Sequence, residues 1–134
     1  MRQFTTTLSP RFHQTDSAGL LFFNEAFTLF HDAYEEWVEH IYGSKKNWFQ
    51  NEAWAVPIKK VSGDFRRPLL AFDACEARVS VKSVGETSFQ LETELLQNGS
   101  VCCTIESVHV FLNKEKRIAQ GIPDPIREKL KPLS

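Results

Sequence analysis

The chain has 134 residues, a formal net charge of −1, 42% hydrophobic residues and 25% charged residues. This composition is typical of a globular domain and argues against disorder. A charge so near zero creates no global field for nucleic acid or an anionic membrane, so we expect neither as a partner. Residues 1–10 lack the apolar core of a signal peptide, and no apolar run approaches the roughly 20 residues of a membrane span. We therefore expect one cytoplasmic domain over residues 1–134.

The cysteines and histidines argue against a disulfide framework and against a metal site. Three cysteines are present, Cys75, Cys102 and Cys103, which is an odd number with two members adjacent. No C-x-x-C pair occurs, and the four histidines are scattered along the chain. We expect reduced cysteines and no bound metal.

The first elements in chain order are a strand and a long helix. Apolar residues alternate with polar ones from Phe4 to Phe12, which predicts a strand. Pro10 cannot donate to a sheet ladder, so the strand is expected at an edge. Residues 13–23 are predicted to form a loop. A helix is predicted from Asn24, a good N-cap, to Tyr42, with Gly43 as its end. Apolar residues at three- and four-residue spacing give it one stripe: Phe27, Phe30, Tyr34, Trp37, Val38 and Ile41.

The second half of the chain has the period of two that is typical of strands. Residues 44–53 are polar and are predicted to form a loop. Four strands are then expected between Trp54 and Leu112, with a bulge near 59–60 and a tight hairpin at Asn98-Gly99. Residues 114–134 form a basic tail with at most a short helix at 124–130. The predicted class is α+β, with one long central helix wrapped by a five-stranded antiparallel sheet joined by hairpins.

The densest group of polar side chains is His13, Asp16, Ser17 and Asn24, where the first strand leads into the helix. Unpaired N–H groups and the positive end of the helix dipole converge there, which suits a carbonyl oxygen that gains negative charge during acyl transfer. A nearby Asp could attack that carbonyl or activate water. The same residues could form a simple turn, and generic spacing alone favours that reading.

Residues 12–24, FHQTDSAGLLFFN, resemble the signature of the 4-hydroxybenzoyl-CoA thioesterase family. Residues 30–37, 56–58 and 64–68 are similar to the related 1,4-dihydroxy-2-naphthoyl-CoA thioesterases. The resemblance covers about residues 4–112. It implies a hotdog fold and thioester hydrolysis without a metal or an organic cofactor. It also implies homodimers or homotetramers whose acyl pocket lies between protomers, against the helix.

The resemblance also implies roles for individual residues. Asp16 matches the catalytic carboxylate of the family, as nucleophile or general base. Phe23 matches the residue whose backbone N–H polarises the thioester carbonyl, and Gly19 matches the loop glycine. His31 matches a helix position of the naphthoyl branch. Phe72 departs from the family pattern, because many relatives have a glycine there.

Basic side chains are the candidates for the phosphates of CoA, because guanidinium and ammonium groups suit phosphate oxygens. These candidates are Arg66, Arg67, Lys114, Lys116 and Arg117. Ordinary solvated turn residues are the alternative. His13 could assist Asp16 or simply end a strand, and His31 could line the acyl pocket or be structural. We expect His109 to be structural.

The leading function is hydrolysis of an acyl-CoA thioester, with an aromatic acyl group of hydroxybenzoyl or dihydroxynaphthoyl type favoured by the resemblance. Short or medium aliphatic acyl-CoA is the nearest alternative. A hotdog hydratase is a second class, but the Asp, Asn-Pro and His pattern of those enzymes is missing from residues 14–24. A non-catalytic acyl-CoA-binding protein is the third.

Overall fold

The computed structural model describes residues 3–131, so the first two residues and the last three residues of the predicted basic tail lie outside the described range. The elements in chain order are β1 (Gln3–Leu8), a 3₁₀ turn η1 (Phe12–Gln14), α1 (Glu25–Tyr42), α2 (Lys45–Gln50), β2 (Trp54–Ala55), β3 (Ile58–Phe65), β4 (Cys75–Val84), β5 (Ser88–Gln97), β6 (Ser100–Val110), β7 (Leu112–Asn113) and α3 (Asp124–Leu130). Five strands form one antiparallel sheet in the order β1-β4-β5-β6-β3, and β2 pairs with β7. The predicted α+β class and five-stranded sheet are confirmed.

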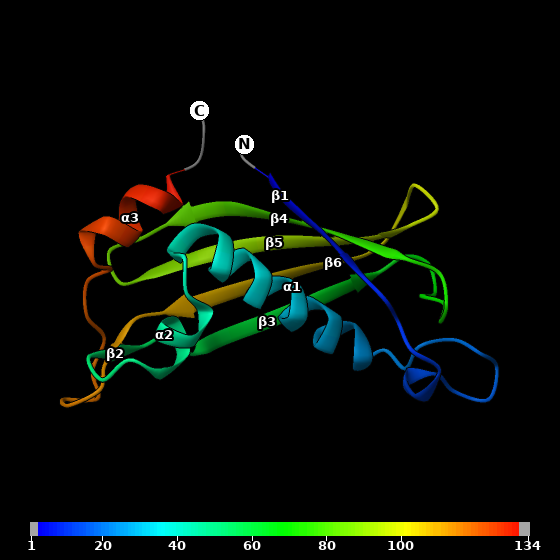
Figure 1. Cartoon of the computed structure of the whole chain (residues 1–134), viewed down its shortest axis with the longest axis horizontal. Coiled ribbons are helices and arrows are strands. Elements are labelled where there is room, and N and C mark those ends of the chain that lie inside the picture. Colours follow the sequence, from blue (N-terminus) through cyan, green and yellow to red (C-terminus); the bar gives the residue numbers. More distant parts are fainter. Residues whose placement is uncertain (1–2, 132–134) are drawn as a thin grey trace.

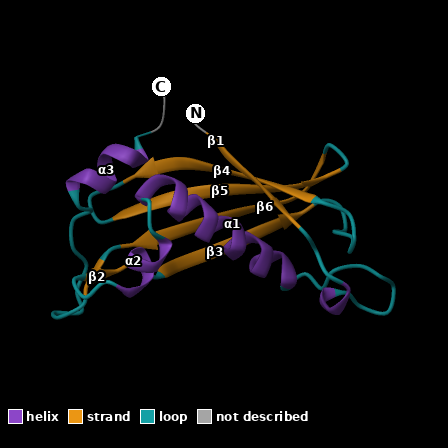
Figure 2. Cartoon of the chain, viewed as in Figure 1, coloured by secondary structure: helices purple, strands orange, loops and turns teal. Residues whose placement is uncertain are grey.

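Helix α1 runs diagonally across one face of the sheet (Figures 1 and 2). Its apolar stripe explains this position, because the stripe must be buried against another element. The fully buried residues of the helix are Ala26, Leu29, Phe30, Ala33, Tyr34, Trp37 and Val38. Gly43 ends the helix at φ 87°, as predicted, and its N–H donates to Glu39 O. Asn24 occupies the N-cap position, but its side chain makes no capping hydrogen bond.

Strand β1 lies at one edge of the sheet, as predicted, and within residues 3–131 it pairs with β4 alone. It ends at Leu8 rather than continuing to Phe12, because Pro10 interrupts the ladder and residues 12–14 curl into η1. Strand β3 forms the other edge and pairs with β6. The expectation that all consecutive strands form hairpins is therefore wrong for β3 and β4, which lie in different parts of the sheet. The connection 66–74 crosses between them at the end that carries the Asp16 loop (Figure 1).

Two local irregularities in the sheet agree with the sequence. The register between β3 and β6 shifts between Ile58 and Lys60, where a bulge was predicted. Asn98 and Gly99 both have positive φ, 53° and 77°, which is the geometry of the tight turn between β5 and β6.

Helix α2 corrects the prediction that residues 44–53 form a loop. Ser44 caps this helix, since its Oγ accepts a hydrogen bond from Asn47 N at 3.2 Å. Trp48 is buried at 1% exposure, and its Nε1 donates to Tyr34 Oη at 3.1 Å. The buried tryptophan, the ring of Phe49 against Tyr34 and the hydrogen bonds from Lys45 to Glu36 and Glu39 together hold a mostly polar segment onto α1.

The three cysteines are all unpaired and buried. Burial raises the pKa of Cys75 to about 12 and the pKa of Cys103 to about 11, so these thiols stay protonated at neutral pH. Within residues 3–131 no helix is both long and apolar enough to cross a membrane.

Candidate active site

Asp16 holds the loop between η1 and α1 closed with its own carboxylate. Its Oδ1 accepts hydrogen bonds from Ala18 N at 2.8 Å and Leu20 N at 3.2 Å. Its backbone N–H donates to Leu20 O, and its carbonyl accepts from the N–H of Gly19, which has φ 80°. Positive φ explains a glycine at that position. Within residues 3–131 the second oxygen, Oδ2, has no hydrogen-bond partner, so one carboxylate oxygen is fixed and the other is free.

Gln14 ties the two ends of this loop together, a role that the sequence analysis missed. Its side chain is 93% buried, with Oε1 accepting from Arg11 N at 2.9 Å and Nε2 donating to Glu25 Oε2 at 3.0 Å. Its carbonyl accepts from Phe22 N at 3.1 Å. A buried amide bonded on both sides resists movement, so the loop entrance and the first residue of α1 are held in fixed relation.

The backbone N–H of Phe23 lies next to the N-terminus of α1. In the described part of the chain it donates to no acceptor, whereas Phe22 N and Glu25 N are both bonded. The 18-residue helix that follows concentrates positive potential at this end. The Phe23 N–H is therefore a free donor in an electropositive position, which is what a carbonyl oxygen with growing negative charge requires.

An apolar groove of about 300 Å³ opens beside Phe23, between the start of α1 and the end of β3. Phe65 forms one wall, and its ring meets the rings of Phe23 and Phe27 edge-on, with centroids 6.4 and 6.1 Å apart. A Cβ on Gly63 would lie 3.0 Å from the Phe65 ring and 3.3 Å from the Phe27 ring. The glycine therefore lets both rings lie close over β3.

The structure brings two of the predicted phosphate-binding residues to this groove and leaves three elsewhere. Arg66 and Arg67 line the groove with Phe23. The segment that carries Lys114, Lys116 and Arg117 follows β7, at the end of the sheet away from the Asp16 loop (Figure 1). Lys114 Nζ donates to Asn51 O there. Within one chain, these three residues and Asp16 do not share a site.

His31 lies on α1, about 9 Å along the axis from the first residue of that helix. Its Nδ1 is 2.8 Å from Glu35 Oε2, and its ring packs near Tyr34 and Phe49. It is not among the residues that line the groove beside Phe23. His109 is fully buried, as expected for a structural residue, and its ring stacks on Phe89 with centroids 4.8 Å apart.

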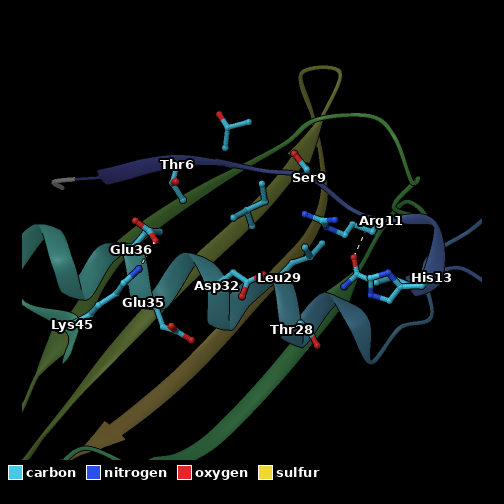
Figure 3. Close-up of a pocket in the computed structure, with 13 residues that line it drawn as sticks. Thr6, Ser9, Arg11, His13, Thr28, Leu29, Asp32, Glu35, Glu36 and Lys45 are labelled. Atoms are coloured by element: carbon cyan, nitrogen blue, oxygen red, sulfur yellow. Dashed lines mark hydrogen bonds and ion pairs between the residues drawn. The ribbon is translucent and has the colours of Figure 1, made fainter. Parts of the chain in front are cut away.

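A second, more polar groove of about 770 Å³ lies between β1 and α1. Figure 3 shows Arg11 and His13 at one end, with Asp32, Glu35 and Glu36 projecting from the helix. Partial burial, followed by the neighbouring Glu35 carboxylate, raises the pKa of Asp32. His13 lines this groove and not the groove beside Phe23, and Asp16 lines neither of them. Within residues 3–131 no three His, Cys, Asp or Glu side chains gather as a metal site would require.

Comparison with known proteins identifies the family of this chain. A family model described as the thioesterase-like superfamily matches residues 10–130. A 1,4-dihydroxy-2-naphthoyl-CoA hydrolase of Nostoc punctiforme is 31% identical over 123 residues, which cover 92% of this chain and 83% of that protein.

Two solved structures have the same fold. A 1,4-dihydroxy-2-naphthoyl-CoA thioesterase from Synechocystis gives a TM-score of 0.87 at 24% identity and covers 96% of both chains. A gentisyl-coenzyme A thioesterase gives a TM-score of 0.85 at 22% identity, covering 96% of this chain and 100% of that one. At these identities the likeness shows the fold alone, and it confirms the hotdog fold expected from the resemblance. With the family model spanning most of its length, this chain belongs to the thioesterase-like superfamily.

Proposed function

We propose that this protein hydrolyses an aromatic acyl-CoA thioester to the free acid and CoA. The observation that carries the proposal is that one loop carries a carboxylate with one unbonded oxygen and, further along, an unbonded backbone N–H. Asp16 Oδ2 and the Phe23 N–H both lack partners within residues 3–131, and one short loop connects them. A nucleophile or base together with a carbonyl-polarising donor is the minimum that thioester hydrolysis needs.

The thioester carbonyl oxygen would accept the Phe23 N–H at the positive end of α1. In the tetrahedral intermediate that oxygen carries a full negative charge, so the donor and the helix dipole stabilise the transition state more than the substrate. The hydrogen bonds of the Gln14 side chain would keep the Phe23 N–H in place before the substrate binds, because they join the start of the loop to Glu25.

Asp16 could act by either of two routes. As a nucleophile, its Oδ2 forms a bond to the carbonyl carbon, the C–S bond breaks, and CoA leaves as a thiolate; water then hydrolyses the resulting mixed anhydride. As a general base, Oδ2 takes a proton from water while the water oxygen attacks the carbonyl carbon; the tetrahedral intermediate then collapses, the C–S bond breaks, and CoA leaves as a thiolate that takes up the proton. Both routes consume one water and yield one acid and one CoA.

The aromatic acyl group is supported by the chemistry of the groove and by the relatives. The groove beside Phe23 has apolar walls that include Phe65, and edge-on contacts between rings are favourable. The relative from Nostoc punctiforme is named for a naphthoyl-CoA substrate, and the gentisyl-CoA thioesterase for another aromatic acyl group. Arg66 and Arg67 would then contact the phosphates of CoA. An aliphatic acyl-CoA is the nearest alternative.

The proposal includes a homodimer that can pair into a homotetramer. Strand β3 is an edge strand whose last seven residues are all exposed, including Val61 and Phe65 at 42% and 43%. A long exposed edge with apolar side chains favours pairing with another chain. In an assembly, His31, Lys114, Lys116 and Arg117 could reach the site of a second protomer. Light scattering would test the assembly, and a monomer at micromolar concentration would contradict it.

We further infer that residues 1–134 act as one domain in the cytoplasm. Helix α3 packs on α1 and β4, and β1 pairs with β4, so elements near both ends of the described chain share one core. Unpaired cysteines and a CoA substrate agree with a reducing compartment. Secretion of the mature protein in an oxidised form would contradict this location.

The test is release of CoA, followed with a thiol-trapping dye, from a panel of aromatic and aliphatic acyl-CoA thioesters. Fast release from hydroxybenzoyl- or dihydroxynaphthoyl-CoA, and slow release from acetyl- and decanoyl-CoA, would support the proposal. Tight binding without release would favour a binding protein instead. Hydration of crotonyl-CoA would favour hydratase chemistry.

A further inference from the structure

Phe72 has an unusual backbone conformation and an unusual exposure. Its φ is 73°, in the left-handed region that residues with a Cβ seldom adopt. Phe72 is 81% exposed, the largest value among the large hydrophobic residues of the described range. A strained backbone that carries a large apolar ring into water contributes little to the stability of the free protein. Such a combination points to a ligand that covers the ring.

The segment around Phe72 is held firmly, so its conformation is imposed by its neighbours. The Phe72 N–H donates to Pro10 O at 3.2 Å. Gln97, which is 95% buried, accepts from Leu70 N at 2.9 Å and donates to Leu70 O at 2.8 Å and Asp73 O at 3.1 Å. Leu21 N donates to Leu69 O at 2.9 Å, which ties the segment to the Asp16 loop.

Phe12 presents a second exposed ring beside Phe72. Phe12 is 70% exposed, and the two ring centroids are 6.3 Å apart with an angle of 18° between the planes. At this separation the rings leave much of their faces free. A flat heteroaromatic ring can stack on either face, or between the two after a small outward rotation. Stacking of a nucleic-acid base on an aromatic side chain is a favourable and recurrent contact.

The order of the side chains along the same segment suits one class of ligand. From β3 onward the chain presents Phe65 at the groove beside Phe23, then Arg66 and Arg67, then Phe72. An acyl-CoA has the same order of parts: an acyl group, a pantetheine arm, phosphates and an adenine ring. Arg66 forms an exposed ion pair with Asp64 at 3.2 Å, whereas within residues 3–131 neither Arg67 nor Arg11, the neighbour of Phe12, takes part in an ion pair.

We propose that Phe12 and Phe72 form a stacking platform for the adenine ring of CoA. This inference rests on the proposed function, because it takes the substrate to be a CoA thioester. The platform would contribute to holding the nucleotide end of the substrate and would take no part in the chemistry at Asp16.

Replacing Phe72 by glycine tests the platform, because Phe72→Gly removes the ring and also relieves the strain of the positive φ. We expect KM for the acyl-CoA to rise about tenfold, with kcat unchanged. KM for the same acyl group on pantetheine, which lacks the nucleotide, should not change. The midpoint of thermal unfolding should not fall. Ile118→Ala is the matched control, since it removes another exposed apolar side chain, at 59%, from a turn after β7, and both KM values should stay as in wild type.

Titration calorimetry with adenosine 3′,5′-bisphosphate separates failure of the platform from failure of the proposed function. Wild type should bind this fragment, and both Phe12→Ala and Phe72→Gly should weaken the binding about tenfold. That result would uphold the platform even if no thioester were hydrolysed. Equal binding by wild type and both variants would overturn it. A change in oligomeric state in Phe72→Gly, seen by light scattering, would overturn it in favour of a contact between copies of this chain.

Discussion

Aromatic side chains at one end of the sheet pack against one another, whereas those at the other end face solvent. At the end that carries α2 and β2, a buried cluster contains Trp48, Phe89 and Phe111, none of them more than 1% exposed. At the end that carries the Asp16 loop, the rings of Phe12, Phe23 and Phe72 are 70%, 71% and 81% exposed. Both sets consist of large aromatic residues, so residue class does not separate them. The difference is what covers the rings: the protein covers the first set, and we propose that the substrate covers the second.

The comparison implies that substitutions at the two ends should affect different properties. Burying a large apolar side chain contributes roughly 1.5–3 kcal/mol, so the packed end should govern the free energy of unfolding. Exposed rings contribute little of this, so the open end should govern binding and turnover. The following experiments test that separation, beginning with the largest expected effect.

Trp48→Ala should lower the free energy of unfolding by about 3–5 kcal/mol. The substitution leaves a cavity among Tyr42, Trp54 and Phe111 and removes the hydrogen bond from the indole to Tyr34 Oη. Urea unfolding followed by far-UV circular dichroism measures the change. Phe23→Ala is the counterpart at the open end. Because the Phe23 ring is 71% exposed, this substitution should change the unfolding free energy by less than about 0.5 kcal/mol, and it keeps the backbone N–H. Equal losses of unfolding free energy in the two variants would show that the two ends of the sheet do not differ in this way.

His109 should make the packed end sensitive to acid. Burial, with a smaller contribution from His31, lowers the pKa of His109 to about 3, and within the described residues its Nδ1 has no hydrogen-bond partner. The folded pKa lies below the unfolded value of about 6.5, so the unfolded chain binds the proton first. The stability contributed by the neutral ring is complete above about pH 6.5. It is lost as pH falls toward 3, by at most about 1.4 kcal/mol per pH unit.

Urea unfolding of wild type and His109→Phe at pH 7, 6 and 5 measures this dependence. The Phe variant keeps a ring that can stack on Phe89 but cannot be protonated. The wild type should therefore lose stability relative to the variant as the pH falls. Parallel curves would show that His109 does not titrate as its burial implies.

Arg67→Ala should raise KM for the acyl-CoA several-fold, with little change in kcat, because a single exposed phosphate contact contributes about 1 kcal/mol or less. The increase should shrink at high salt, which screens the contact in wild type. Lys116→Ala, which removes a basic side chain at the other end of the sheet, is the matched control. An equal rise in KM for Lys116→Ala would show that a second protomer supplies part of the phosphate site.

The sequence predicts the regular parts of the fold well and the irregular parts poorly. Periodicity is enough for α1 and the main strands, and the Asn98-Gly99 turn and the bulge near Lys60 follow from local chemistry. Helix α2 was missed because six mostly polar residues have no periodic stripe, and contacts with α1, chiefly that of buried Trp48 with Tyr34, fix them. The Ser44 cap was the one local signal. The pairing of β3 with β6 was missed because a strand's neighbours depend on contacts far apart in sequence.

In the candidate site too, residues within one sequence motif could be predicted, whereas residues that the fold brings together could not. Asp16, Gly19 and Phe23 could be picked out because a contiguous motif carries them. Gln14 could not, since its function depends on Glu25 lying within 3.0 Å after folding. The groove beside Phe23 combines α1, β3 and residues 66–69, which only the fold brings together. The basic residues after β7 resembled Arg66 and Arg67 in sequence, yet the fold places them at the other end of the sheet (Figure 1).

The central claim is that the Asp16 carboxylate drives thioester hydrolysis, and Asp16→Asn tests it most directly. The amide oxygen can still accept from Ala18 N and Leu20 N, so the loop and the unfolding midpoint should be preserved. The neutral side chain can neither attack the carbonyl nor take a proton from water. We predict that kcat for the best aromatic acyl-CoA falls by at least about 100-fold, within the range typical of losing a general base or nucleophile. A correctly folded Asp16→Asn protein that releases CoA at the wild-type rate would contradict the account.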